Sequence, residues 1–175
     1  MSMSATSTYA EALRCMLCKA VCEGGPHVEA LIKALIDEGA DPNAHVSNRV
    51  GSPTLLIHAT HRGDAREAKI RALLAGGADV NAQDLYGTTA LMHAAQHGGE
   101  HAAAMVRVLL SAGADASKQD VGGWTALMLA ARYGREHGAA MMRLLMQHGG
   151  RVAADKQSED GITALMLAAQ GRGEH

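Results

Sequence analysis

Phenylalanine is absent from the sequence, and tryptophan occurs once and tyrosine three times in 175 residues. Large aromatic rings therefore cannot dominate the core, although 47% of the residues are hydrophobic. The apolar residues are mostly alanine, leucine, methionine and valine. Small and straight side chains favour helices that pack closely together, and a chain of this length can bury one sizeable core or a short array of stacked units. The composition thus predicts a helical globular protein.

An excess of either charge is also missing. The formal net charge is -2 at pH 7, and no run of lysine and arginine occurs. Nothing therefore attracts the chain to nucleic acid or to an anionic membrane surface. No apolar stretch reaches the roughly 18 residues that span a bilayer, and the N-terminus lacks the basic and apolar regions of a signal peptide. We expect neither nucleic-acid binding nor membrane insertion.

Cysteines are few and crowded, at Cys15, Cys18 and Cys22. An odd number so close together is not a secreted disulfide framework, which favours a reducing compartment, the cytoplasm with the nucleus as an alternative. A zinc site would need a fourth ligand such as His27. The spacing of the cysteines puts all three on one helical face, where burial as small apolar side chains is expected and metal or redox chemistry is the alternative.

One phrase recurs along the chain. It begins at Gly87 as GTTALMHAAQHGGEH, at Gly123 as GWTALMLAARYGREH and at Gly161 as GITALMLAAQGRGEH. The threonines of the three copies are 36 and 38 residues apart, and a weaker copy, TLLIHATHRGD, begins at Thr54. Recurrence at such an interval is the signature of a repeat architecture.

A second phrase alternates with the first, and aligned glycines stand in it at positions 39, 77, 113 and 149. In both phrases the apolar residues are three and four apart, which predicts two amphipathic helices in each unit. The glycine, Gly149 included, is expected to end the second helix, because glycine tolerates the left-handed conformation. Segments such as GADVNAQDLYGT then predict hairpin loops. Each helix pair has more apolar surface than it can hide, so the units must stack into a solenoid.

These phrases resemble the ankyrin repeat family, whose unit is a turn and two helices over about 33 residues. The resemblance implies an all-α, ankyrin-type helical solenoid of stacked helix-turn-helix repeats with hairpin loops. It covers residues 27–175 well and places one domain over residues 1–175. The expected units are an N-terminal capping repeat at 5–44, repeats at 45–82, 83–118 and 119–156, and an incomplete repeat at 157–175.

Two departures from the family pattern stand out. Met92, Met128 and Met166 occupy the position of the histidine in the family's Thr-Pro-Leu-His phrase, so the hydrogen bond of that histidine is expected to be absent, with apolar packing by methionine in compensation. The units are also about three residues longer than the family pattern. The excess lies in HGGEHAAA and YGREHGAA, where we expect a longer loop or an extra helical turn.

The sequence ends at AAQGRGEH, just before a second helix is due. A half repeat would leave Leu165, Met166 or Leu167 partly uncovered, whereas complete arrays end in a polar cap. We therefore expect this chain to be the N-terminal part of a longer array or multidomain protein. The protein is expected to be a monomer, with self-association through the unfinished repeat as an alternative.

The resemblance implies that the hairpin tips and the inner side of the first helices form a concave binding surface. Tryptophan, tyrosine and arginine are enriched among residues that dominate binding energy, and several of them map to that surface. The predicted partner-binding residues are Tyr86, Gln96, His97, Trp124, Arg132 and Tyr133. The alternative is structural, with Trp124 packed on the neighbouring tip and Tyr133 filling a loop.

Histidines in HAAQHGGEH also permit a metal hypothesis. His93, His97 and His101, with Glu100, could offer ligands to zinc. Against it, alanine stands where a zinc hydrolase has glutamate, and leucine replaces His93 in the later copies. Hydrogen-bonded or solvated histidines are favoured, and Glu100 and Glu136 are expected near the start of the second helices, where negative charge is stabilising.

No phosphate-binding loop, nucleophile elbow or paired acidic motif occurs. The sequence therefore predicts no catalysis and no cofactor, and favours a scaffold or adaptor module that binds another protein. The alternative is the regulatory or targeting ankyrin portion of a larger enzyme or channel. The fold does not name the partner.

Overall fold

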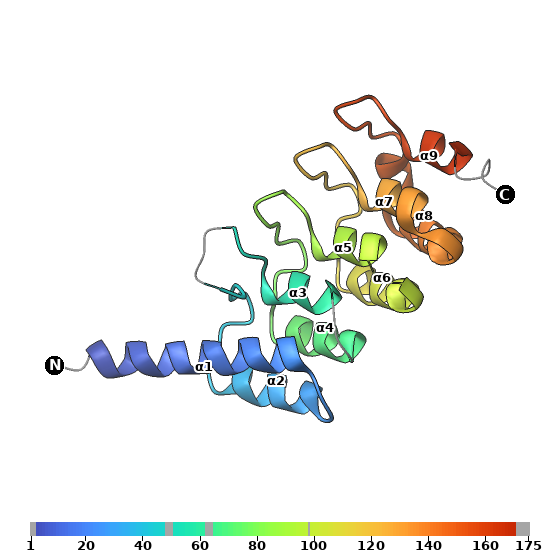
Figure 1. Cartoon of the computed structure of the whole chain (residues 1–175). Helices are drawn as coiled ribbons and strands as arrows, with labels where there is room; N and C mark the ends of the chain where they lie inside the picture. The colour runs from blue at the N-terminus through green and yellow to red at the C-terminus, as the bar shows by residue number, and fades with distance from the viewer. Residues whose placement is uncertain (1–2, 48–50, 62–64, 98, 171–175) are drawn as a thin grey trace.

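The computed structural model describes residues 3–47, 51–61, 65–97 and 99–170. Over these residues the chain is helical, and its helices stand in pairs along a stack from which hairpin loops project to one side (Figure 1). The described ranges contain no strand, only isolated bridges between His45 and Thr54 and between Gln83 and Thr89. The predicted all-α solenoid is confirmed.

Each unit contributes a first and a second helix, and the two pack against each other. First helices also contact the first helices of neighbouring units, and second helices contact second helices, which continues the core along the stack (Figure 1). The first helices are α1 (Met3–Glu23), α3 (Leu55–His61), α5 (Ala90–His97), α7 (Ala126–Tyr133) and α9 (Ala164–Gln170). The second helices are α2 (Val28–Asp37), α4 (Arg66–Ala75), α6 (Ala102–Ser111) and α8 (Gly138–Ala154).

The hairpin loops are joined tip to tip by backbone hydrogen bonds. Val121 N–H donates to the carbonyl oxygen of Tyr86 at 2.9 Å, and Glu159 N–H donates to that of Gly122 at 3.0 Å. At Gly123 a positive φ and a close approach coincide, because a Cβ there would lie 2.9 Å from the Cα of Ser158 in the next tip. Glycine is thus required where one tip rests on another.

Amide side chains link the turns of successive repeats. Asn43 Oδ1 accepts from Asp79 N–H at 2.7 Å, and Asn81 Oδ1 accepts from Asp115 N–H at 2.8 Å. Gln119 Nε2 donates to the carbonyl oxygen of Gln157 at 2.9 Å. These side chains satisfy backbone groups that no strand or helix pairs, and they hold the register between units.

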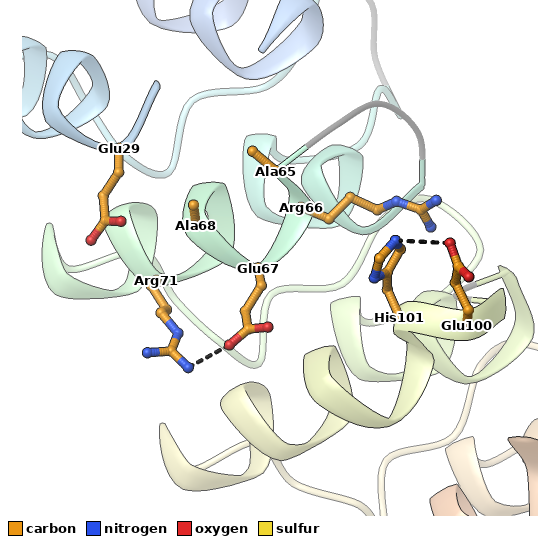
Figure 2. Close-up of a pocket in the computed structure, with 8 residues that line it drawn as sticks. All are labelled: Glu29, Ala65, Arg66, Glu67, Ala68, Arg71, Glu100 and His101. Atoms are coloured by element: carbon orange, nitrogen blue, oxygen red, sulfur yellow. Dashed lines mark hydrogen bonds and ion pairs between the residues drawn. The ribbon is translucent and has the colours of Figure 1, made fainter. Parts of the chain in front are cut away.

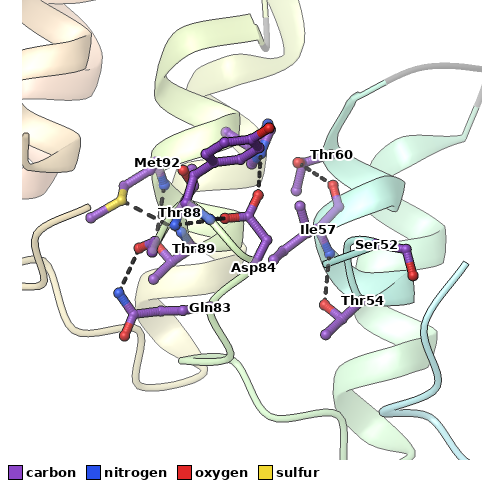
Figure 3. A network of polar contacts seen from close by, with 12 residues as sticks. Ser52, Thr54, Ile57, Thr60, Gln83, Asp84, Thr88, Thr89 and Met92 are labelled. Atoms are coloured by element: carbon purple, nitrogen blue, oxygen red, sulfur yellow. Dashed lines mark hydrogen bonds and ion pairs between the residues drawn. The ribbon is translucent and has the colours of Figure 1, made fainter. Parts of the chain in front are cut away.

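Threonine begins the first helices. Thr125 is the N-cap of α7, and its hydroxyl accepts from Met128 N–H. Thr89 accepts in the same way from Met92 N–H, while the Met92 sulfur accepts from Thr89 N–H at 3.5 Å (Figure 3). Met92 and Met128 are also fully buried. Sulfur is a weak acceptor, so Met92 provides apolar packing and a weak substitute for the hydrogen bond that a histidine would make there.

The extra residues between paired helices form single 3-10 turns, η1 (Gly99–His101) and η2 (Arg135–His137). The expectation of an added turn is confirmed. Glu100 and Glu136 lie within these turns, immediately before α6 and α8 rather than in their first turns.

Gly149 interrupts the second helix as expected, but the expected left-handed conformation is wrong. Gly39, Gly77 and Gly113 have positive φ after α2, α4 and α6, whereas Gly149 has an extended φ of 175° at a kink inside α8. Helical structure resumes and continues to Ala154. The reason is local: Gly150 and Arg151 stand here in place of the alanine and aspartate of the turn-forming GAD phrase, and the helix-compatible Val152, Ala153 and Ala154 come next.

Candidate functional site

Four of the six predicted contact residues line one cavity of about 640 Å³. Gln96 and His97 come from the last turn of α5, and Arg132 and Tyr133 come from the last turn of α7. The two first helices contact each other along the stack, so their equivalent ends meet. The remaining lining residues are Ala95, Gly99, Glu100, Gly134, Glu136, His137 and Met141.

The lining of this cavity combines side chains of different chemistry. The guanidinium carbon of Arg132 lies 5.7 Å from the centroid of the exposed Tyr133 ring, a cation–π arrangement. The lining also includes Glu100 and Glu136 from the 3-10 turns, and Glu136 Oε1 lies 3.3 Å from His137 Nε2. The cavity thus combines a guanidinium, an aromatic ring and two carboxylates in its lining.

The other two predicted residues lie on the hairpin tips. Tyr86 is exposed beside the exposed Leu85, and Val121 is exposed on the next tip. Trp124 is half-buried and packs against the apolar core, with its Cδ1 3.2 Å from where a Cβ on Gly122 would lie. The tips therefore present the exposed apolar side chains of Leu85, Tyr86 and Val121. The partner-binding role of the half-buried Trp124 stays a prediction.

A family model described as ankyrin repeats, in three copies, matches residues 17–120 and 99–175. The chain belongs to the ankyrin repeat family. Ankyrin repeats are generally protein–protein interaction modules. A search of curated proteins gave no match. None of the helices over the described residues combines the length and the hydropathy that crossing a bilayer requires.

A second cavity, of about 660 Å³, lies beside the second helices of the ankyrin stack (Figure 2). It is lined by Glu29 of α2, by α4 and by η1. Arg71 pairs with Glu67, and His101 Nε2 lies 3.3 Å from Glu100 Oε1 (Figure 2). Because no tyrosine or tryptophan is among its lining residues, the cavity is a weaker candidate for partner binding than the one between α5 and α7.

The histidines do not assemble as the metal hypothesis requires. His93 and His97 lie with His61 of the preceding repeat, at ring-centroid distances of 5.1–5.9 Å, whereas His101 lines the second cavity. Within the residues that the structure describes, no group of three histidine, cysteine or acidic side chains could hold a metal ion. The prediction from the sequence did not include His61, because this residue belongs to the weakest copy of the repeated phrase.

His93 is the buried member of this cluster. Its Nε2 lies 3.7 Å from Asp84 Oδ2, and its Nδ1 is buried with no hydrogen-bond partner. Burial lowers the pKa of His93 from the ordinary 6.5, Asp84 opposes that shift, and His61 and His97 add to it. Burial and His61 also lower the pKa of His97. The neutral forms are therefore favoured in the folded repeat.

The expected burial of the cysteines is wrong for two of them. Cys15 and Cys22 are exposed, Cys18 is half-buried, and all three are free thiols. Burial raises the pKa of Cys18, and its thiol donates to the carbonyl oxygen of His45 at 3.6 Å. The spacing places the three on one side of α1, but that side faces largely away from the buried stripe. The stripe consists of Leu13, Leu17, Ala20 and Val21.

Proposed function

We propose that this ankyrin protein is an interaction module, without catalysis of its own, that binds a partner protein through its hairpin tips and the ends of its first helices. The observation that supports the proposal is the cavity between α5 and α7, which brings Gln96, His97, Arg132 and Tyr133 together. These side chains stand on helices fixed by a continuous core, so binding would cost little ordering of the site. The free thiols favour a cytoplasmic or nuclear location.

The chemistry of the cavity indicates how a partner would be held. An acidic side chain suits the Arg132 guanidinium, which can form paired hydrogen bonds to a carboxylate. A neighbouring apolar side chain suits the Tyr133 ring. The carboxylates of Glu100 and Glu136 favour a basic residue of the partner. A partner segment with charges of both signs around an apolar residue meets all three requirements.

The test compares proteins captured from a cell lysate by the native chain and by the double variant Arg132→Ala, Tyr133→Ala. The matched control is Tyr9→Ala, which removes an exposed tyrosine on α1. We expect partners captured by the native chain and the control to be lost with the double variant, while circular dichroism shows unchanged helical content. Equal capture by all three proteins would contradict the proposal, and loss of helicity would assign the pair a structural role.

A further inference from the structure

Three histidine rings meet at the junction between the repeats of α3 and α5. His61 of α3 lies beside His93 and His97 of α5, and the ring centroids are 5.1–5.9 Å apart. His61 and His97 are exposed, whereas the His93 side chain is 19% exposed. The equivalent positions at the junction of α5 and α7 hold Gln96, Leu129 and Tyr133. None of those side chains can become positively charged, so the cluster distinguishes the junction of α3 and α5 from the next one.

The first helices around this cluster carry no acidic residue. Their sequences are LLIHATH in α3, ALMHAAQH in α5 and ALMLAARY in α7. Arg132 of α7 is exposed and lines the same cavity as His97. Each proton that a histidine gains therefore adds positive charge beside a guanidinium, with no carboxylate on these helices to balance it. We name the surface formed by His61, His93, His97 and Arg132 the histidine face.

Carboxylates near the histidine face come from other elements. Asp84 of the hairpin loop lies with its Oδ2 3.7 Å from His93 Nε2, but its side chain is 9% exposed. Its Oδ1 also accepts from Thr88 N–H (Figure 3). Glu100 and Glu136 line the cavity between α5 and α7, and their side chains are 80% and 84% exposed. Solvent therefore screens these two charges, and Asp84 is largely covered.

The other elements packed against α3 add little negative charge. Lys69 of α4 is buried, and it lowers the pKa of His58 after burial of that ring and the neighbouring His61. On α1, Arg14 Nη2 lies 3.7 Å from Glu11 Oε1. The surroundings of the cluster thus leave room for carboxylates that a binding partner would supply.

We propose that the histidine face holds an acidic segment of the partner protein, and that this segment binds more tightly as the pH falls from 7.5 to 5.5. The inference rests on the interaction function proposed above, and it adds the chemistry of the partner and a control by pH. Carboxylates bound beside the rings favour their charged forms, so binding takes up protons. Each proton taken up strengthens binding by as much as about tenfold per pH unit.

The direction of the pH effect follows from the unbound chain. Burial is the main cause that lowers the pKa of His93 and of His97 below the ordinary 6.5, and His61 adds to both shifts. A bound carboxylate raises these pKa values again. Affinity is therefore constant above the pKa of the complex and rises as the pH falls towards the pKa of the free chain. Nucleic acid is a less suitable occupant, because its binding needs several lysines and arginines, and the histidine face has only Arg132.

The experiment measures binding of a fluorescent peptide that alternates aspartate and serine to the purified 175-residue protein. Fluorescence anisotropy gives the dissociation constant at pH 7.5 and 5.5 and at constant ionic strength. Aspartate stays ionised over this range, because its ordinary pKa is about 3.9. We expect the dissociation constant to fall at least about tenfold between the two pH values, which corresponds to one proton taken up over one pH unit. Circular dichroism should show the same helical content at both.

Two variants remove one titrating ring each. His61→Gln and His97→Gln should each reduce the gain in affinity at pH 5.5 by about threefold or more. Glutamine is chosen because Gln96 occupies the position of His61 in the next repeat. The matched control His148→Gln changes an exposed histidine on α8 and should keep the full pH dependence.

A dissociation constant independent of pH would overturn the proposal, as would absence of binding at pH 5.5 or loss of helical content there. The same reduction in His148→Gln would also overturn it. Equal binding of an oligothymidylate of the same net charge would replace the acidic segment by nucleic acid. Partner capture at pH 7.5 through Arg132 and Tyr133 is measured separately. That capture can succeed where the peptide fails, so failure of the histidine face is distinguished from failure of the interaction function.

Discussion

The units built on α5–α6 and α7–α8 have similar sequences, and they fold alike until their second helices end. After α6, Gly113 takes a φ of 89°, and Ala114 N–H donates back to the carbonyl oxygen of Leu109 at 3.0 Å. In α8 the aligned Gly149 is extended, and the helix resumes beyond it. The comparison teaches that the aligned glycine interrupts the helix in both units but does not fix what comes next. The residues after it decide whether a turn or another helical segment follows.

A second difference concerns the side-chain links that join the units. Asn81, which follows the GAD phrase of α4, bonds to the next turn at Asp115 N–H. Ser117 stands at the equivalent place one unit later, and its hydroxyl bonds to Asp115 Oδ1 within its own turn at 2.6 Å. A glutamine link is present at both junctions, because Gln83 Nε2 donates to the carbonyl oxygen of Gln119 at 3.2 Å and Gln119 Nε2 donates to that of Gln157. The later junction therefore depends on one kind of side-chain link where the earlier junction has two.

The largest expected effect is a difference in stability between substitutions in the interior of the stack and at its end. Leu91→Ala opens a cavity among buried side chains and should lower the free energy of unfolding by about 2–5 kcal/mol. Leu165→Ala, at the equivalent exposed position, should change it by less than about 0.5 kcal/mol. Urea denaturation of the two variants under dilute conditions measures both values. Equal losses would show that Leu165 is covered within the single chain.

The next largest effect tests the two glycines. Gly113→Ala forces alanine into the left-handed region, which costs roughly 1–2 kcal/mol. Gly149→Ala should be nearly neutral, because its φ is extended and a Cβ there would lie 3.4 Å from the Cβ of Ala116. Midpoints of thermal unfolding for both variants provide the measurement. A larger loss at Gly149 than at Gly113 would contradict the kink as described.

A smaller effect is expected from the links between turns. Asn81→Ala removes bonds to Asp115 N–H and to the carbonyl oxygen of Gly113, at a cost of about 1 kcal/mol. Ser117→Ala removes a bond confined to one turn and should cost about half as much. Hydrogen exchange at Asp115 N–H should accelerate in the first variant, and unchanged exchange there would argue against the asparagine link.

The smallest effect is on the pH dependence of stability. It compares α5, which has His93, with α7, where leucine stands at the same position. The folded pKa of His93 lies below the unfolded value of 6.5, so the unfolded chain binds more protons. Stability is therefore fully present above about pH 6.5 and is lost as the pH falls towards the folded pKa. His93→Leu should reduce this loss when unfolding is compared at pH 7.5 and 5.5, whereas His148→Leu, at an exposed site of α8, should not. If the free energy of unfolding of His93→Leu fell with pH as much as that of the native chain, His93 would not be the cause of the loss.

The stack itself could be predicted because its information is local and repeated. Thr89 and Thr125 mark helix starts, Gly77 and Gly113 mark helix ends, and the apolar spacing fixes the buried faces. Gln96, His97, Arg132 and Tyr133 could be placed together because equivalent positions of adjacent repeats meet. These inferences need only the register, which the repetition of the phrases supplies.

Other features depend on contacts that no single phrase contains. The kink at Gly149 results from competition between a helix-ending glycine and helix-forming residues after it. Exposure of Cys15 and Cys22 depends on which side of α1 meets α2 and α3, and spacing alone does not decide that side. His61 joins His93 and His97 only because the first helices of two units pack together.

The bonds between hairpin tips also bear on mechanics. Because the backbone N–H of Val121 is tied to the carbonyl of Tyr86, and that of Glu159 to the carbonyl of Gly122, a pull on one loop is shared with its neighbours. The linked loops should therefore resist bending together, whereas unlinked loops would bend independently. A ligand that grips a single loop would meet the combined stiffness of several.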